Sequence, residues 1–120
     1  MSDPPVGRRV LIVEDESLIA MTAEDMLENV GWRPVGVATS CRSALAAVAK
    51  GGFDIAMIDI NLRGEDSGPV ADALAQAGIP FIFTTGYGKA RVPERHREAG
   101  IIAKPYDARS LDAALQAAAR

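Results

Sequence analysis

Charged and hydroxylated side chains follow four short apolar segments of this 120-residue chain. Glu14 and Asp15 come directly after the run VLIV, and Asp59 ends the segment FDIAMID. Thr85 closes the stretch PFIFTT, and Lys104 follows the run IIA. Carboxylates, a hydroxyl and an ammonium can together hold a divalent cation and a phosphoryl group. They can do so only if the fold brings the four segment ends to one place.

The apolar segments are continuous rather than alternating, which favours strands buried on both faces of a parallel sheet. They cover residues 9–13, 34–38, 53–58, 80–84 and 101–103. Helical apolar spacing occurs between them and after the last one, around residues 18–30, 44–48, 70–77 and 111–118. This alternation predicts a doubly wound α/β domain with a five-stranded parallel sheet in the flavodoxin-like strand order 2-1-3-4-5.

The fourth crossover, residues 86–100, does not follow the helical pattern. It has two glycines at its start, Pro93 inside, and Val92 as its only large aliphatic residue. A helix here would bury little apolar surface, so helix 4 is predicted to be weak or disordered. His96 is expected to be solvated in this charged segment. Its local stability should be low, so a small change in free energy would shift its conformation. We therefore expect residues 86–99 to act as a conformational switch.

Two further positions predict helix boundaries. Gly31 suits the left-handed position after the first helix, and Trp32 could then pack back on Leu27 as a structural residue. Asp107 is a plausible N-cap of the last helix.

In a doubly wound sheet, ligands bind outside the carboxyl ends of the strands, and strands 1 and 3 are neighbours. The carboxylates of Glu14, Asp15 and Asp59 are therefore expected to converge. Two carboxylates about 5 Å apart repel by roughly 3 kcal/mol at an effective dielectric of about 20. Since the donors are hard oxygens without His or Cys, Mg²⁺ is the expected neutralising ion. Asp59, flanked by the metal, Lys104 and Thr85, could then accept a phosphoryl group.

Composition narrows the function classes. A net charge of -3 and a pI near 5.1 argue against nucleic acid or an anionic membrane as the main partner. The single Cys41 excludes an internal disulfide and a cysteine-built metal site. The sequence shows neither a membrane-length apolar run nor a signal peptide, so a cytoplasmic location is expected. Residues 1–8 are predicted to be a flexible lead-in to one domain, residues 9–120.

With these motifs the chain resembles a response-regulator receiver (CheY-like) domain of two-component systems over residues 9–119. The resemblance implies that Asp15 binds Mg²⁺ directly, that Glu14 does so through water, and that the Asn61 carbonyl completes the metal shell. It also implies that Asp59 accepts a phosphoryl group from a histidine kinase or a phosphotransfer protein.

In that family a hydroxyl after strand 4 and a Lys-Pro pair after strand 5 complete the site. The resemblance therefore implies that Thr85 and Lys104 hold the phosphoryl oxygens, and that the bond between Lys104 and Pro105 is cis. Ile101 stands where many receivers carry an aromatic switch, so a rotating-aromatic mechanism is not implied here.

The stretch PFIFTTGYG, residues 80–88, resembles the FAT GUY group of receivers, with Thr84 where Ala is usual. That group often works with histidine kinases of the HWE type. The resemblance implies a stand-alone phospho-acceptor switch rather than an enzyme, one that assists only its own phosphorylation and dephosphorylation. Its downstream protein partner is expected on the face formed by helix 4, strand 5 and helix 5.

Two alternatives remain at this stage. A Mg²⁺-dependent phosphatase could use Asp59 as its nucleophile, but such enzymes need a second acid two residues later, where this chain has Asn61. A flavin-binding module would cradle phosphate after strand 1, where this chain places repelling acids.

Overall fold

The computed structural model describes residues 8–86 and 92–119, and its main feature is a five-stranded parallel sheet. The sheet contains β1 (Arg9–Val13), β2 (Arg33–Ala38), β3 (Ile55–Asp59), β6 (Phe81–Thr85) and β7 (Gly100–Ala103). Their spatial order is β2-β1-β3-β6-β7, which in chain order of the sheet strands is 2-1-3-4-5. The predicted topology is confirmed.

A short antiparallel hairpin, absent from the prediction, lies just beyond β3. It pairs β4 (Asn61–Leu62) with β5 (Glu65–Asp66). The hairpin begins two residues after Asp59 and leads into α3, so it stands beside the carboxyl edge of the sheet.

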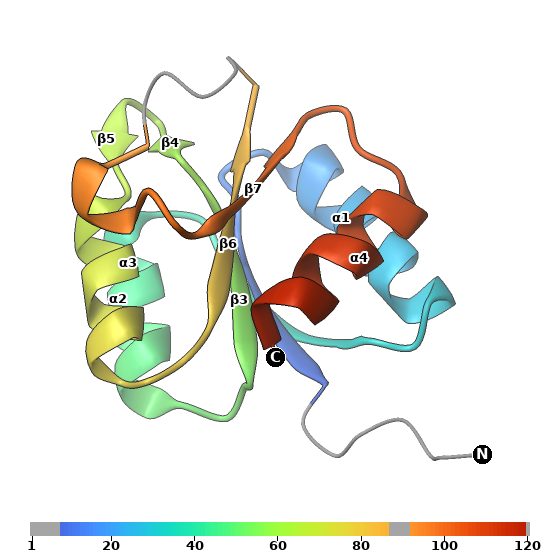
Figure 1. Ribbon diagram of the computed structural model, residues 1–120, viewed down its shortest axis with the longest axis horizontal. Helices are drawn as coiled ribbons and strands as arrows, with labels where there is room; N and C mark the ends of the chain where they lie inside the picture. Colours follow the sequence, from blue (N-terminus) through green and yellow to red (C-terminus); the bar gives the residue numbers. More distant parts are fainter. Residues whose placement is uncertain (1–7, 87–91, 120) are drawn as a thin grey trace.

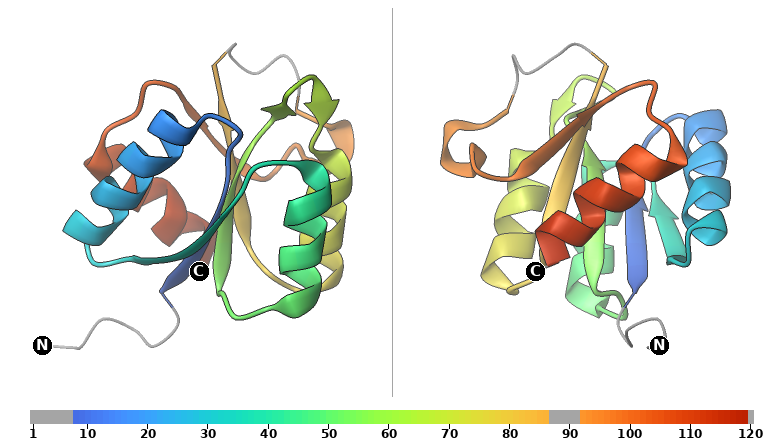
Figure 2. Two further views of the ribbon diagram at one scale, coloured as in Figure 1. Left: turned by 180° about the vertical axis from the view of Figure 1, so that it is seen from behind. Right: turned by 45° about the vertical axis from the view of Figure 1, so that its right-hand side comes forward.

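Helices cover both faces of the sheet, as Figures 1 and 2 show. On one face lie α2 (Cys41–Lys50) and α3 (Gly68–Gln76), and on the other lie α1 (Ser17–Asn29) and α4 (Ala108–Ala119). No helix in the described ranges combines the length and the apolar character that crossing a membrane requires.

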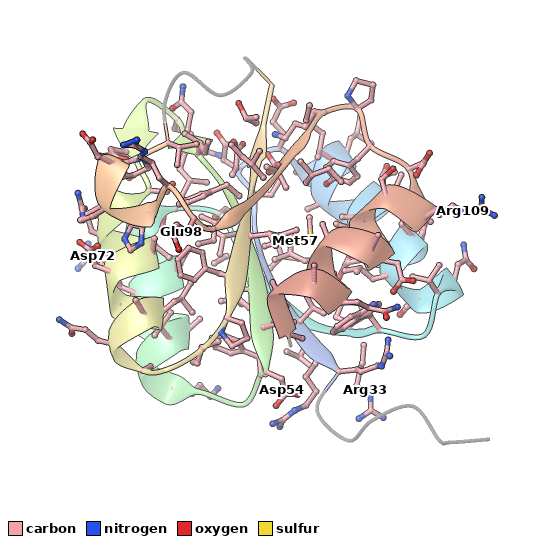
Figure 3. All side chains as sticks on the ribbon, viewed as in Figure 1. Arg33, Asp54, Met57, Asp72, Glu98 and Arg109 are labelled. Atoms are coloured by element: carbon pink, nitrogen blue, oxygen red, sulfur yellow. The ribbon has the colours of Figure 1, made fainter. Side chains whose placement is uncertain are left out.

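This layering explains the continuous apolar strands. Leu11 and Val13 of β1 belong to the core beneath α2 and α3, whereas Val10 and Ile12 belong to the core beneath α1 and α4. In β3 all five residues are buried, and Met57 lies in the α1–α4 layer (Figure 3). Because both faces are buried, strand residues are apolar on both faces until the strand reaches the carboxyl edge at Asp59. This removes the period-2 pattern of a half-exposed strand.

The end of α1 follows the predicted geometry. Gly31 has a φ of 94°, and its N–H donates to the Glu28 carbonyl at 3.3 Å. The Trp32 N–H donates to the Leu27 carbonyl at 2.9 Å, which completes a Schellman motif. The buried Trp32 indole also donates to Asp112 Oδ1 of α4 at 2.7 Å. The structural role predicted for Trp32 is confirmed.

The last helix has the predicted cap, because Asp107 Oδ1 accepts a hydrogen bond from the Ser110 N–H at 2.8 Å. This bond satisfies one of the unpaired donors of the first helical turn.

The described part of the fourth crossover, residues 92–99, holds a 3₁₀ turn at Glu94–His96 and no α-helix. Val92 packs against the core beneath α2 and α3, as the predicted aliphatic anchor should. The prediction for His96 was wrong: its side chain is only 10% exposed, and its ring lies edge-on to Phe81 with centroids 5.5 Å apart. The earlier part of the predicted switch, including Tyr87 and Gly88, lies outside the described residues.

Candidate functional site

Four parallel strands end at the same edge of the sheet, and each supplies a predicted site residue. Glu14 and Asp15 directly follow β1, Asp59 is the last residue of β3, and Thr85 is the last residue of β6. Lys104 directly follows β7. Because parallel strands share one carboxyl edge, side chains up to 90 positions apart in sequence meet there.

The three carboxylates converge as predicted. One oxygen each from Glu14, Asp15 and Asp59 lies within 4.8 Å of the other two. Glu14 is 3% exposed and Asp59 7% exposed, while the side chain of Asp15 is 15% exposed. Hard oxygen donors gathered at this spacing fit the ligand preference of Mg²⁺.

Lys104 connects two of these acids. Its Nζ lies 2.9 Å from Asp59 Oδ2 and 2.8 Å from Glu14 Oε1. The contact with Asp59 was expected, but the equally short contact with Glu14 was not. Burial alone would lower the pKa of Lys104, but its hydrogen bonds to Glu14 and Asp59 outweigh burial and raise the pKa above its usual value. The ammonium therefore stays charged at neutral pH.

Glu14 experiences opposing influences. Burial raises the pKa of its carboxyl group and the nearby charge of Asp59 raises it further, while hydrogen bonds from Lys104 and from the Glu16 N–H lower it. The net pKa lies above the ordinary value. Keeping Glu14 ionised beside Asp59 therefore costs folding free energy in the metal-free protein.

Hydrogen bonds from backbone N–H groups hold the end of β3 and its surroundings in place. The Asn61 N–H donates to Asp59 Oδ1 at 3.2 Å, and the Gly64 N–H donates to Asn61 Oδ1 at 2.7 Å. On the other side, the Lys104 N–H donates to the carbonyl of the buried Thr85 at 2.8 Å. These bonds tie the end of β3 to the hairpin and the end of β6 to the start of the Lys104–Pro105 segment.

The bond between Lys104 and Pro105 is cis, as the resemblance implied. Ile101, at the position of the usual aromatic switch, is half-buried on β7 and packs against the core beneath α2 and α3. It is therefore a packing residue in this structure.

Sequence reasoning missed one charged residue at the site. Arg63, at the turn between β4 and β5, places its Nε 3.9 Å from Asp15 Oδ2. The run NLRGED, residues 61–66, contains a glycine among polar residues between two apolar segments, which is a turn signal that could have predicted the hairpin.

An apolar groove borders the site on its α1 side. Its lining residues are Leu18, Ile19, Thr22, Met26, Gly86, Lys104, Pro105 and Tyr106. Burial, followed by the charge of Glu14, raises the pKa of Tyr106 to about 12, so this phenol stays neutral. Leu18, at the rim, is 77% exposed.

Comparison with known proteins agrees with this geometry. Residues 10–116 match the family model of the response regulator receiver domain. Transcriptional regulatory protein PdtaR of Mycobacterium tuberculosis is 32% identical over 121 residues, which cover 98% of this chain and 59% of PdtaR. Phyllosphere-induced regulator PhyR of Methylorubrum extorquens is 34% identical over 117 residues, 94% of this chain and 44% of PhyR. The chain spans about half the length of these curated relatives.

Among solved structures, SdrG from Sphingomonas melonis Fr1 is 46% identical, with a TM-score of 0.82 over 92% of this chain and 94% of SdrG. The BeF3-activated conformation of SdrG from Pseudomonas melonis Fr1 is 44% identical, with a TM-score of 0.81 over 94% of this chain and 97% of that one. The similarity to SdrG and PhyR is consistent with the predicted subfamily. Fold, site geometry and sequence similarity agree: the chain belongs to the response-regulator receiver domain family of two-component systems.

Proposed function

We propose that this domain is a phospho-acceptor switch in which Asp59 receives a phosphoryl group from a phosphohistidine of a histidine kinase or phosphotransfer protein. One observation carries the proposal. Asp59 lies nearly buried at the carboxyl edge of the sheet, between the Lys104 ammonium and the acids Glu14 and Asp15. A carboxylate in this position can act as a nucleophile whose product is neutralised by groups already in place.

In the transfer, an Asp59 oxygen forms a bond to phosphorus while the phosphorus–nitrogen bond of the phosphoimidazole breaks, and the imidazole leaves with the electron pair. Lys104, already 2.9 Å from Asp59, balances the charge of the new phosphoryl oxygens. Thr85 supplies a hydroxyl from the neighbouring strand. Mg²⁺ held by Asp15, Asp59 and the Asn61 carbonyl, with Glu14 acting through water, would neutralise further phosphoryl charge.

A switch is favoured over the alternative of a Mg²⁺-dependent phosphatase. A phosphatase using Asp59 would need an acid two residues later to protonate the leaving group. Asn61 occupies that position, and its side-chain oxygen accepts the Gly64 N–H. We infer that the domain is not an enzyme toward other substrates and assists only its own phosphorylation and dephosphorylation.

The phosphoryl donor is proposed to approach along α1. Leu18 and Met21 are exposed on that helix, and Lys104 is one of the residues that line the apolar groove defined above. An amphipathic helix carrying the phosphohistidine suits such a surface. The resemblance to FAT GUY receivers favours an HWE-type kinase in the cytoplasm as that donor.

The downstream protein partner is proposed to bind where the fourth crossover, β7 and α4 meet. A groove lined by Phe81, Arg95, Ala99, Gly100 and Ala117 opens at this face. The Thr85 carbonyl is bonded to the Lys104 N–H, so movement of Thr85 toward a phosphoryl group would pull on both β7 and the crossover. The BeF3-activated conformation known for SdrG supports a second state for this chain.

Incubation with acetyl phosphate and Mg²⁺ tests the acceptor assignment. Intact-mass analysis should show one added phosphoryl group in the wild type and none in Asp59→Asn. Asp54→Asn is the matched control, because Asp54 pairs with Arg9 at the start of the sheet, away from the site. Undiminished labelling of Asp59→Asn would place the acceptor elsewhere.

A further inference from the structure

The charges at the site are unevenly paired. Lys104 bonds Glu14 and Asp59 but is not the partner of Asp15. Within the described residues, these three carboxylates and this ammonium have a summed formal charge of -2. In the part of the chain that the structure describes, Asp15 pairs with Arg63 at 3.9 Å, and the charge of Arg63 brings this sum to -1. Arg63 thus pairs with Asp15, whereas Lys104 pairs with Glu14 and Asp59.

The position of Arg63 is set by an unusual backbone. Its φ is 53°, in the left-handed region that residues with a Cβ seldom adopt, and Gly64 follows with a φ of 83°. The bond from the Gly64 N–H to Asn61 Oδ1 closes this turn at 2.7 Å. The hairpin that starts beside Asp59 therefore directs Arg63 back over the acidic edge.

The side chain of Arg63 reaches Asp15 through its guanidinium group. It is 72% exposed, whereas Asp15 is 15% exposed. A guanidinium reaching from solvent can move away at little cost when another cation takes the carboxylate. It balances Asp15 without closing the site.

We propose that Arg63 is an internal competitor for the cation site and sets its Mg²⁺ affinity. Arg63 neutralises Asp15 in the metal-free protein and gives up this contact when a divalent ion binds, since both cations need the same carboxylate and repel each other. This inference rests on the proposed function, in which Asp15 is a direct metal ligand.

The size of the effect follows from the exposure of the pair. Exposed ion pairs are weak, so removing the charge of Arg63 should tighten Mg²⁺ binding about two- to fivefold. The difference should shrink at high ionic strength, because salt screens exposed charges. Arg63→Lys, which keeps the charge, should bind Mg²⁺ more weakly than Arg63→Gln does.

Isothermal titration of the whole chain with MgCl₂ measures this directly. Arg63→Gln should lower the Mg²⁺ dissociation constant, while Arg97→Gln should leave it unchanged. Arg97 is a matched control, because it is similarly exposed and pairs with Glu94 on the 3₁₀ turn. An equal or higher dissociation constant in Arg63→Gln would overturn the inference.

The variant Asp15→Asn distinguishes a failure of the metal site from a failure of the role proposed for Arg63. If it abolishes Mg²⁺ binding while Arg63→Gln binds like the wild type, the metal site stands and only the role of Arg63 fails. If Asp15→Asn binds Mg²⁺ as tightly as the wild type, the metal site of the proposed function is wrong and the inference about Arg63 fails with it.

Discussion

Glu14 illustrates how a single buried acid can lower the stability of a fold. It is almost fully buried, next to Asp59, and it shares the Lys104 ammonium with that same acid. Its raised pKa means that the folded protein binds the Glu14 proton more tightly than the unfolded chain does. The stabilising contribution of the protonated form is present at low pH and is lost as pH rises through the raised pKa.

Glu14→Gln should therefore stabilise the metal-free protein at pH 7, by about 1 kcal/mol, because it removes one like charge while Lys104 keeps Asp59 as partner. Urea unfolding in EDTA measures the change. The gain should vanish as pH falls toward 4, where Glu14 is protonated in the wild type. The exposed neighbour Glu16 provides the control, since Glu16→Gln should leave stability nearly unchanged. A loss of stability in Glu14→Gln at pH 7 would contradict this account.

At the scale of elements, α3 is linked to the 3₁₀ turn of the fourth crossover through Asp72, whose side chain lies at the junction of the two (Figure 3). Arg95 binds both oxygens of Asp72, at 2.8 and 2.9 Å, and His96 Nε2 lies 2.7 Å from Oδ1. His96 also packs edge-on against Phe81 of β6. The turn is therefore held by one polar cluster and by ring contacts of His96 with Phe81 and Phe83, instead of by a helix with an apolar face.

Asp72→Asn should loosen this turn, because it removes the charge that Arg95 binds bidentately. Hydrogen exchange of amides in residues 94–99 should accelerate several-fold, with little change in β3 or β6. Glu94→Gln, which breaks only the exposed pair with Arg97, is the control. Unchanged exchange in Asp72→Asn would show that ring packing alone holds the turn.

The same cluster has a pH dependence of opposite sign to that of Glu14. Hydrogen bonds from Arg95 and then His96 lower the pKa of Asp72 to about 2. Its contribution is therefore present above the ordinary Asp pKa near 4 and is lost as pH falls toward 2. Acid should loosen this turn through Asp72 only in that range.

At the scale of the whole molecule, the sheet couples the site to global stability. The acids at the carboxyl edge repel one another in the native fold and separate when the chain unfolds, so a cation that bridges them should bind the native state preferentially. Binding of a cation at the carboxyl edge should therefore increase the free energy of unfolding.

Mg²⁺ should accordingly raise the melting temperature. At ten times its dissociation constant the gain is about 1.4 kcal/mol, which corresponds to a shift of a few degrees. Asp15→Ala should remove the dependence on Mg²⁺. Scanning calorimetry with matched ionic strength distinguishes this effect from general screening, and a full Mg²⁺ response in Asp15→Ala would contradict it.

The amino-acid sequence by itself determined the layered fold and which polar residues meet at the carboxyl edge of the sheet. Strands buried on both faces must be continuously apolar, so β1 and β3 could be recognised without their neighbours. The parallel topology then required that Asp15, Asp59 and Lys104 meet at one edge. Gly31 and Trp32 were predictable for the same reason, because the end of a helix depends on residues a few positions apart.

Only the tertiary structure decided which charged side chains pair with each other at that edge. The contact of Lys104 with Glu14 joins residues 90 positions apart, and it depends on side-chain directions that no local pattern specifies. His96 is buried because Phe81 and Asp72 surround it, although its own segment is polar. Arg63 reaches Asp15 because the chain turns through a left-handed conformation between β4 and β5. Each of these contacts joins residues of different elements and depends on how those elements pack. Periodicity in the sequence indicates only which face of a single element is apolar.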